Sequence, residues 1–521
     1  MKRIISLLLC TVLLAGTVIS VSLAASAEEI GAAPVAAPVD SEDLATTAAD
    51  YTPEDSPLHV PKLVVTTEAG NGPELMKEDG YVNAHAVITD TDGSVLEDDA
   101  QFKVRGNTTA FGSCKKKAFT IKYAKKKEVL GMGKGKKWAL LANAFDPTLL
   151  RNYIAFELGR TMGLPYVSKQ RITELWLDGS YRGVYTVTVP VQSGSDRVDI
   201  DSDNEESPDF LIETEKSREE EGVTYFTSGG QRFGIQEPEE PSDNKVTYIQ
   251  NTMDGIFAAI ATGDRAQIEQ VLDVDSFAKF YIFNEFVKTV DIDFASVFFF
   301  YKGGKLYAGP PWDYDFSMAG GAPNVAASYR EATPTTGPYA YNKNIFKHLC
   351  KLDWFMEEAC QVYEDNYSYM YNIACDGGQL DTLANEYSVE FNNNFTKTEW
   401  TIRKWWINYA RQPLGTYQEN LDFLKNWCFE RDLWMTGYFK PFKGEFLIGD
   451  ADGDDEISVV DVTLITRILS EFYRDEDGMF TLRGDSNLDG LDITDATVIQ
   501  KYLADFEIAY AIGEPQEYEG Y

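Results

Sequence analysis

The chain has 521 residues, of which 44% are hydrophobic and 13% aromatic, and its formal net charge is −36. This apolar content is ample for a large core and excludes an intrinsically disordered protein. The negative charge argues against nucleic acid as a partner, because nucleic-acid binding needs a cationic surface. A chain of this length should hold about two or three domains.

The N-terminus has the pattern of a secretory signal peptide. Lys2-Arg3 precedes an apolar stretch over 4–23, and Ala25-Ser26-Ala27 supplies the small residues of a cleavage site. We therefore expect residues 1–27 to be a signal peptide and the protein to be secreted or attached to a cell-surface scaffold, with no membrane span after cleavage. An uncleaved anchor helix is the alternative, because the apolar stretch approaches the roughly 20 residues that cross a bilayer. Residues 28–57, rich in Ala, Pro and acidic residues, are predicted to be a linker.

Alternation of apolar and polar residues predicts strands in the first half of the chain. The predicted strands cover 62–67, 82–88, 118–123, 171–177, 184–189 and 297–301. A helix is predicted over 147–162, with Asp146 as its N-cap and Pro147 at its first position. Helical patterns dominate 246–286 and 344–438. The expected fold class is α+β, with a strand-rich first half and a helix-rich second half.

Motifs in a fixed order run through the large central region. They are Val104-Arg105-Gly106-Asn107-Thr108-Thr109, residues 116–122, residues 137–143, Asp146 with Leu150-Arg151-Asn152, residues 177–185, and Gly309-Pro310-Pro311-Trp312-Asp313-Tyr314-Asp315. In this order they resemble the CotH family of atypical, protein-kinase-like proteins named for a spore-coat member. The resemblance implies a kinase-like domain over 58–440 that uses Mg²⁺ and ATP and has a protein substrate.

Phosphoryl transfer needs carboxylates on Mg²⁺ and a carboxylate that orients the acceptor hydroxyl. Asp313 and Asp315 lie two residues apart, so at the end of an extended strand both would face one side and could bind Mg²⁺ together. Asp291 and Asp293 have the same spacing, and one of them would be the catalytic residue that orients the acceptor. Alternatively, the carboxylates beside Trp312 only cap a turn within a packed core.

Cationic side chains are also needed to contact the phosphates. Arg105, Lys117 and Lys122 are the candidates, and Glu213 is a candidate ion-pair partner for one of the lysines. The lysines belong to a basic run that could instead be a solvated hairpin face.

The chain also departs from the CotH pattern after residue 185. The family usually has a glutamate four residues after the position of Tyr185, where this chain has Val189. The sequence therefore leaves open whether the domain is an enzyme.

A repeat near the C-terminus has the spacing of paired calcium loops. Gly449-Asp450-Ala451-Asp452-Gly453-Asp454 returns as Gly484-Asp485-Ser486-Asn487-Leu488-Asp489, and oxygen ligands at every second position suit Ca²⁺. The first site would use Asp450, Asp452, Asp454, the carbonyl of Glu456, Ser458 and Asp461. The second would use Asp485, Asn487, Asp489 and Asp495. The second loop is shorter by one residue, so its last ligand, Asp495, would lie one residue earlier in the loop than Asp461 does in the first.

A helical run is predicted after each loop, and no entering helix is expected before either. This arrangement resembles a type I dockerin over 445–508, followed by an acidic tail over 509–521. The resemblance implies a cohesin module of a bacterial scaffoldin as partner, contacted by Val459-Val460 and Ile493-Thr494. Alternatively, these apolar pairs only pack the small domain.

The resemblances together imply a secreted, dockerin-bearing component of a cellulosome-like complex whose main domain phosphorylates protein Ser or Thr. The alternative is a catalytically inactive CotH-like module that serves structure, adhesion or glycan contact in a polysaccharide-degrading complex. Glycoside hydrolysis is less favoured, because it needs two carboxylates about 5 to 10 Å apart across a cleft. Trp405, Trp406, Trp427 and Trp434, which could form a sugar platform, recur in a helical region typical of core residues.

Overall fold

The computed structural model describes residues 51–110, 114–202, 204–216, 219–220, 222–398, 400, 402, 409–439, 443–470, 475, 479–487 and 490–519. The predicted signal peptide, most of the predicted linker, and Trp405 and Trp406 lie outside these ranges. A large hydrophobic core extends from Val60 to Phe439, and a separate small core extends from Phe446 to Ile512. The predicted mixed α+β class is confirmed, with strands concentrated before residue 240 and helices after it.

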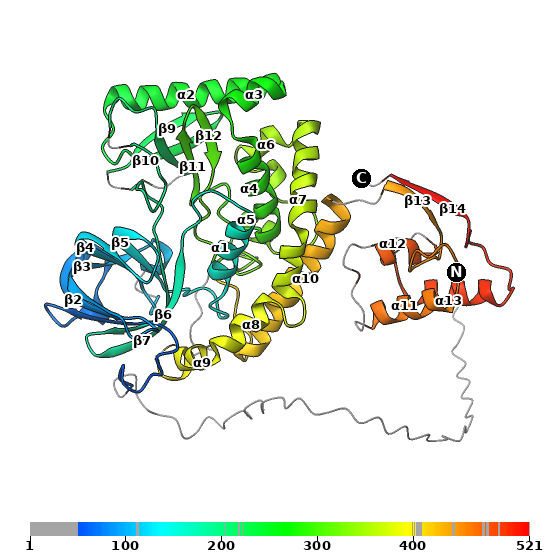
Figure 1. Cartoon of the computed structure of the whole chain (residues 1–521), viewed down its shortest axis with the longest axis horizontal. Helices are drawn as coiled ribbons and strands as arrows, with labels where there is room; N and C mark the ends of the chain where they lie inside the picture. Colours follow the sequence, from blue (N-terminus) through cyan, green and yellow to red (C-terminus); the bar gives the residue numbers. More distant parts are fainter. Residues whose placement is uncertain are drawn as a thin grey trace, which may run out of the picture. The chain divides into compact units, whose positions relative to one another are not determined.

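Among the described residues, seven strands close into a barrel with the order β1-β2-β3-β4-β5-β7-β6 (Figure 1). They are β1 (Lys62–Thr67), β2 (Val82–Thr89), β3 (Val95–Arg105), β4 (Ala118–Glu128), β5 (Lys134–Leu141), β6 (Gln170–Leu177) and β7 (Ser180–Thr188). The neighbouring strands are antiparallel except β1 and β6, whose parallel pairing closes the barrel. Successive side chains of a strand point to opposite faces of the sheet, and residues of β3, β4 and β5 line the cleft described below.

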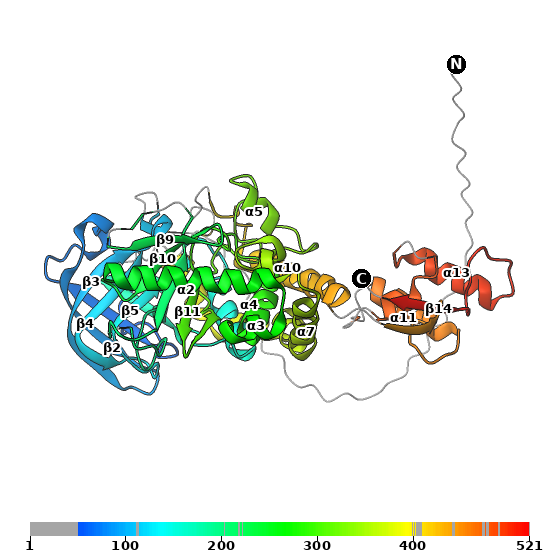
Figure 2. The ribbon, with the colours of Figure 1, turned by 90° about the horizontal axis from the view of Figure 1, so that it is seen from above.

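A second sheet has the strand order β12-β11-β8-β10-β9. Its strands are β8 (Phe210–Thr214), β9 (Thr224–Ser228), β10 (Gln231–Glu237), β11 (Val297–Lys302) and β12 (Lys305–Ala308). Helix α2 (Asp243–Thr262) crosses this sheet (Figure 2). The contact is close, because a Cβ at Gly229 would lie 2.4 Å from the ring of Phe257. The sheet stands beside the barrel and supplies the second wall of the site described below.

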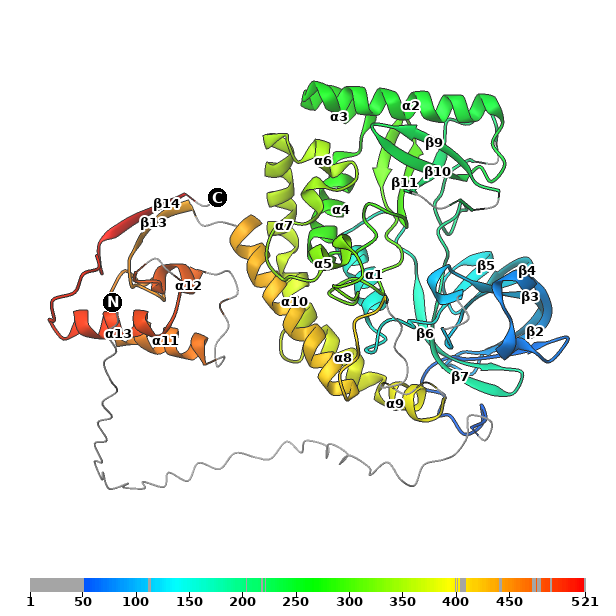
Figure 3. The same ribbon diagram turned by 180° about the vertical axis from the view of Figure 1, so that it is seen from behind.

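Helices fill most of the remaining main domain, as the sequence predicts. They are α1 (Arg151–Thr161), α3 (Arg265–Val271), α4 (Val274–Val287), α5 (Ala327–Ala332), α6 (Phe346–Leu349), α7 (Asp353–Ala374), α8 (Gln379–Glu386), α9 (Ser388–Thr396) and α10 (Tyr417–Phe439). Short 3₁₀ helices cover Gly72–Glu74, Lys77–Asp79, Thr108–Ala110 and Ala340–Asn342. Helix α4 contacts α1, α7 and α10, and α9 packs on β7 (Figure 3).

The helix predicted over 147–162 begins later, at Arg151. Asp146 is not its N-cap residue; its Oδ1 accepts the Thr148 N–H at 2.9 Å, and its Oδ2 accepts the Arg151 N–H at 2.7 Å. Asp146 therefore closes a turn that replaces the expected first helical turn. Arg151 also pairs with Asp146 through Nη1 and donates from Nε to the Ser317 carbonyl at 3.0 Å.

The C-terminal module contains β13 (Lys443–Leu447), α11 (Val459–Leu469), α12 (Met479–Gly484), α13 (Ile493–Leu503) and β14 (Pro515–Glu519). Helix α12 corrects the expectation that no helix enters either loop. It forms because Asp475 accepts the N–H groups of Phe480 and Thr481, at 3.2 and 2.6 Å, and so caps the run. Part of the predicted acidic tail is a strand, since β14 pairs with β13.

The end of the predicted linker packs on the barrel. The ring of Tyr51 lies 4.9 Å from that of Tyr181, and Trp176 Nε1 donates to the Tyr51 carbonyl at 2.8 Å.

Two of the four tryptophans considered for a sugar platform lie within the described residues. Trp427 is buried, and its Nε1 donates to the Thr333 carbonyl at 2.7 Å. Trp434 stacks on Tyr438 with ring centroids 4.8 Å apart.

Candidate functional site

A cleft of about 790 Å³ opens between the barrel and the second sheet. Its walls come from β3, β4 and β5, from β8, and from residues 291–298 and 312–329. The cations described in its lining come from the barrel region and are Lys77, Lys103, Arg105 and Lys137. The acids come from residues after 210 and are Glu213, Glu215, Glu220, Asp291, Asp313 and Asp315. The cleft therefore has a cationic wall and an anionic wall.

Asp313 and Asp315 both line the cleft, although the backbone at Asp313 is not extended as predicted. Asp313 has a φ of 67°, in the left-handed region. Asp315 is only 7% exposed, and no donor in the described part of the chain hydrogen-bonds its carboxylate. Burial and the charges of Asp313 and Asp291 raise the pKa of Asp315 well above its usual range. A divalent cation would stabilise this buried carboxylate beside two half-buried ones.

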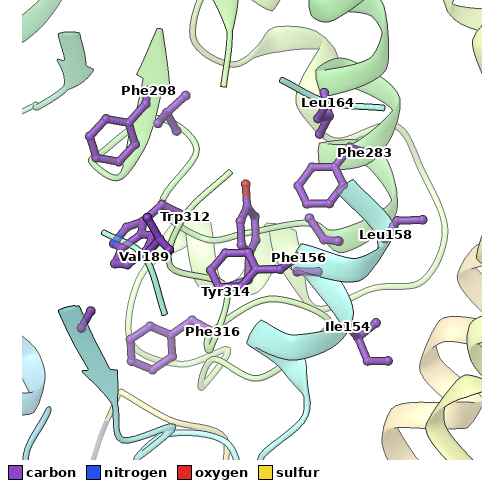
Figure 4. Packing of buried hydrophobic residues seen from close by; sticks show 14 of the residues in the cluster. Ile154, Phe156, Leu158, Leu164, Val189, Phe283, Phe298, Trp312, Tyr314 and Phe316 are labelled. Carbon is purple, nitrogen blue, oxygen red and sulfur yellow. The ribbon is translucent and has the colours of Figure 1, made fainter. Parts of the chain in front are cut away.

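The aromatic residues of this acidic segment pack into the core. Trp312 packs against Phe156 with centroids 6.0 Å apart, Tyr314 meets Phe283 edge-on at 5.2 Å, and Phe316 stacks on Phe145 at 4.7 Å (Figure 4). The Tyr314 N–H also donates to Asn152 Oδ1 at 2.7 Å. The packed core considered around Trp312 is therefore real, and it fixes Asp313, between Trp312 and Tyr314, and Asp315, between Tyr314 and Phe316, at the cleft.

The structure separates the two candidates for the acceptor-orienting residue. Asp291 lines the cleft, and its charge acts on Asp315. Asp293 is not among the lining residues; its Oδ1 accepts the Asn344 N–H at 2.6 Å. Of the two, Asp291 is therefore the one that lines the cleft.

Arg105 reaches the cleft from the end of β3. Its guanidinium carbon lies 5.1 Å from the centroid of the Trp312 ring. Burial lowers the pKa of Arg105, and the opposite charge of Asp313 counters that effect. Arg105 thus brings a positive charge close to the acidic segment, as a phosphate ligand requires.

The predicted lysines occupy other positions. Lys117 does not line the cleft; it is buried, and its Nζ donates to the Ala110 carbonyl at 3.2 Å. Lys122 lies beside the lining, with its Nζ 5.3 Å from the centroid of Tyr81. The sequence reasoning missed Lys103 and Lys137, which do line the cleft. Strand alternation places Lys103 on the face of Arg105, but β3 and β5 were not predicted.

Glu213 lines the cleft from β8, where its Oε1 accepts the Ser296 N–H at 2.7 Å. Val189, which stands where a glutamate was expected, is buried and belongs to the large core cluster of the main domain (Figure 4). Glu213 and Glu215 both supply carboxylates to the cleft. The change at Val189 therefore does not leave this region without acidic side chains.

The first predicted calcium loop brings carboxylates together. Among the described residues, ligand oxygens of Asp450, Asp452 and Asp454 all lie within 4.8 Å of one another. The Asp450 carboxylate accepts the N–H groups of Gly453 at 2.8 Å and Asp455 at 2.9 Å. Asp455 adopts a φ of 67°, the left-handed conformation that glycine usually supplies in such loops.

The electrostatics of this loop also suit a cation. Burial and the carboxylates of Asp461 and Asp454 raise the pKa of Asp452. Burial likewise raises the pKa of Asp461, whose Oδ2 accepts the Ser458 N–H at 2.7 Å. Ser458 caps α11 by accepting the Val460 N–H at 3.0 Å. The roles of Ser458 and the Glu456 carbonyl as ligands stay predictions.

The second loop repeats this hydrogen-bond pattern. Asp485 Oδ2 accepts the Gly490 N–H at 2.9 Å, as Asp450 accepts that of Asp455. Asp495 is fully buried; its Oδ1 accepts the Ser486 N–H at 2.9 Å and its Oδ2 the Asp492 N–H at 2.7 Å. Asn487 lies half-buried in this loop, and Asp489 falls outside the described residues.

The four predicted contact residues are exposed, and three of them are apolar. Val459 is 70% exposed, Val460 53% and Ile493 62%, and Thr494 is also exposed. They lie in the first turns of α11 and α13. The alternative that these residues only pack the small domain is therefore wrong.

A family model described as CotH kinase protein matches residues 102–435, more than half of the chain. No curated protein matches the chain. Over the residues that the structure describes, no helix combines the length and hydropathy needed to cross a bilayer.

Proposed function

The chain belongs to the CotH kinase protein family, and from this premise we propose that its cleft transfers the γ-phosphoryl group of ATP to a hydroxyl group of a protein. Asp313 and Asp315 would hold Mg²⁺, and Arg105 would contact the phosphates. Asp291 would orient the acceptor hydroxyl. Each of these residues lines the same cleft.

The observation that carries this proposal is the environment of Asp315. A buried carboxylate beside other carboxylates needs a proton or a cation to be stable. Asp313 and Asp315 offer the hard oxygen ligands that Mg²⁺ prefers. When bound, Mg²⁺ neutralises negative charge on the transferring phosphoryl group.

The chain's own residues would act by positioning and charge. Arg105 draws the phosphate oxygens toward the acidic segment by charge-assisted hydrogen bonds. Asp291 accepts a hydrogen bond from the acceptor hydroxyl and takes its proton as the oxygen forms its bond to the γ-phosphorus. The bond from the γ-phosphorus to the bridging oxygen breaks, and ADP leaves with that electron pair.

The test is thermal unfolding of the full chain with and without millimolar ATP and Mg²⁺, beside phosphotransfer from labelled ATP to casein-type protein acceptors. Asp315→Ala should lose the nucleotide-dependent stabilisation and the transfer. Asp293→Asn, outside the cleft lining, is the matched control and should keep both. No stabilisation of the unaltered chain would contradict the proposal. Stabilisation without transfer would favour the catalytically inactive alternative.

We also propose that the C-terminal module is a type I dockerin that binds Ca²⁺ and attaches the chain to a cohesin of a scaffoldin outside the cell. The clustered carboxylates of Asp450, Asp452 and Asp454 support the calcium site. The exposure of Val459, Val460 and Ile493 supports contact with a partner, since it leaves large apolar side chains open to one.

Binding of the full chain to a panel of cohesins tests this second assignment. Val459→Asp with Ile493→Asp should abolish binding, and excess EDTA should do the same because metal binding and folding are coupled. Val95→Asp, at an exposed valine of the barrel, is the control and should leave binding unchanged. Binding that persists in EDTA would refute the calcium assignment.

A further inference from the structure

Lysines converge on the barrel wall of the cleft. Lys122 on β4 lies directly opposite Lys137 on β5, and Lys103 on β3 lies opposite Thr120, one step along the same face. Side chains two residues apart on a strand share a face. These lysines therefore lie on the face that presents Thr120 to the cleft.

This arrangement places like charges together. Like charges directly opposite each other destabilise a sheet. The ring of Tyr81 offsets part of the repulsion, because Lys103 Nζ lies 4.5 Å and Lys122 Nζ 5.3 Å from its centroid. Burial lowers the pKa of Lys103. The neighbouring cations, including Lys137 and Arg105, lower this pKa further.

Anionic partners are scarce at this wall. Lys137 Nζ pairs with Glu239 at 3.0 Å, but Glu239 is 72% exposed, so solvent screens this pair. Within the described ranges, Lys103 and Lys122 have no ion pair with a carboxylate. The wall therefore has the charge to accept an acidic ligand.

The spacing of the cations distinguishes an extended peptide from the phosphate groups of a nucleotide. Arg105 pairs with Ala118, whereas Lys122 pairs with Gln101, four residues earlier on β3. At about 3.3 Å per residue, the Lys122–Lys137 pair is about 13 Å along the strands from Arg105. Three linked phosphates held at Arg105 are too short to reach it. An extended peptide crosses the same distance in about four residues.

We propose, on the basis of the proposed function, that Lys122 and Lys137 form a subsite for an acidic side chain of the acceptor protein, about four residues from the phosphorylated hydroxyl. Lys103 lies between this subsite and Arg105. The acceptor class is thus a Ser- or Thr-containing segment with Asp or Glu at that position, bound in extended conformation.

The test uses the full chain with ATP and Mg²⁺ and extended peptides that carry one serine. Glu, Gln or Lys is placed four residues before the serine in one series and four residues after it in the other. In one series, kcat/KM should be at least tenfold higher for Glu than for Gln, and lower still for Lys. Lys122→Gln with Lys137→Gln should bring the Glu-to-Gln ratio close to one, and Lys122→Glu with Lys137→Glu should make Lys the preferred residue.

Lys125→Glu with Lys126→Glu supplies the matched control, because both lysines are exposed on β4 and neither pairs with Lys137. This variant should keep the Glu preference. The subsite would be overturned if the control lost the Glu preference to the same extent. Equal rates for the Glu and Gln peptides with the unaltered chain would also overturn it.

Affinities of the same peptides, measured by fluorescence anisotropy, separate the subsite from the kinase assignment. Tighter binding of the Glu peptide without phosphotransfer would support the subsite and contradict the proposed function. Phosphotransfer to all peptides at equal rates would support the proposed function and contradict the subsite.

Discussion

Arg431 on α10 donates from Nη2 to Glu285 Oε2 on α4 at 2.8 Å, and both side chains are fully buried. Arg431 Nη1 also donates to the Thr335 and Gly337 carbonyls, and Glu285 accepts the N–H of Tyr339. The Tyr339 hydroxyl in turn donates to the Thr289 carbonyl at 2.7 Å, two residues before Asp291. The buried pair thus supports the backbone that presents a candidate site residue.

Replacing Glu285 with Gln should lower the free energy of unfolding of the main domain by about 3–5 kcal/mol, because Arg431 would stay buried without its opposite charge. Urea unfolding measures this change. Asp275→Asn, which breaks the exposed pair of Asp275 with Lys279, should cost less than about 1 kcal/mol. Equal losses of unfolding free energy in the two variants would show that the buried pair stabilises the fold no more than the exposed pair.

Asp315→Asn should make the metal-free protein more stable at neutral pH. A raised pKa in the folded state gives stability that is present below the unfolded value and is lost as pH rises through the folded value. At neutral pH the aspartate therefore destabilises the metal-free fold, and the amide removes that cost. The melting temperature with Mg²⁺ and with EDTA measures both effects: the variant should melt higher in EDTA and gain nothing from Mg²⁺. A lower melting point in EDTA would contradict this reasoning.

Lys288, which follows α4, should make stability depend on pH. Burial and the charge of Arg431 lower its pKa to about 7, from 10.5. Between these values the unfolded chain holds a proton that the folded chain lacks. Stability should therefore rise with pH by up to about 1.4 kcal/mol per unit in this window. The difference in unfolding free energy between the unaltered chain and Lys288→Met, measured from pH 7 to 9, isolates this contribution; parallel curves would exclude it.

Calcium should bind the first loop of the C-terminal module, and Asp450→Ala should remove that binding. Asp450 both belongs to the carboxylate cluster and folds the loop by accepting the N–H groups of Gly453 and Asp455. Calorimetric titration of the full chain with Ca²⁺ measures the loss, and Asp505→Asn, outside both loops, should keep the heat of the unaltered chain. Unchanged heat in Asp450→Ala would place the ion elsewhere.

Local patterns predicted much of the secondary structure. The strand over 62–67 is found with the same bounds, because its alternating side chains meet solvent and core in turn. Strand β5 was missed because Lys134, Lys136 and Lys137 obscure its pattern. The turn at Asp146 was mistaken for a helix start, since the ion pair with Arg151 that stabilises it depends on the folded geometry.

The site residues that belong to family motifs could be predicted from the sequence. The residues that strand pairing brings to the cleft could not. Arg105, Asp313 and Asp315 were named from their motifs, and all of them line the cleft. Lys103 and Lys137 come from separate strands, and only the register of the barrel brings them to one wall. The choice between Asp291 and Asp293 likewise depended on the hydrogen bond of Asp293 to Asn344.

The pairing of β13 with β14 places Lys443 directly opposite Glu519, so the polypeptide enters and leaves the C-terminal module at adjacent points. Chain ends that meet in this way allow a compact unit to be inserted into a host without stretching either side. The module should therefore be portable: spliced into an exposed hairpin of an unrelated carrier, it would keep both loops intact.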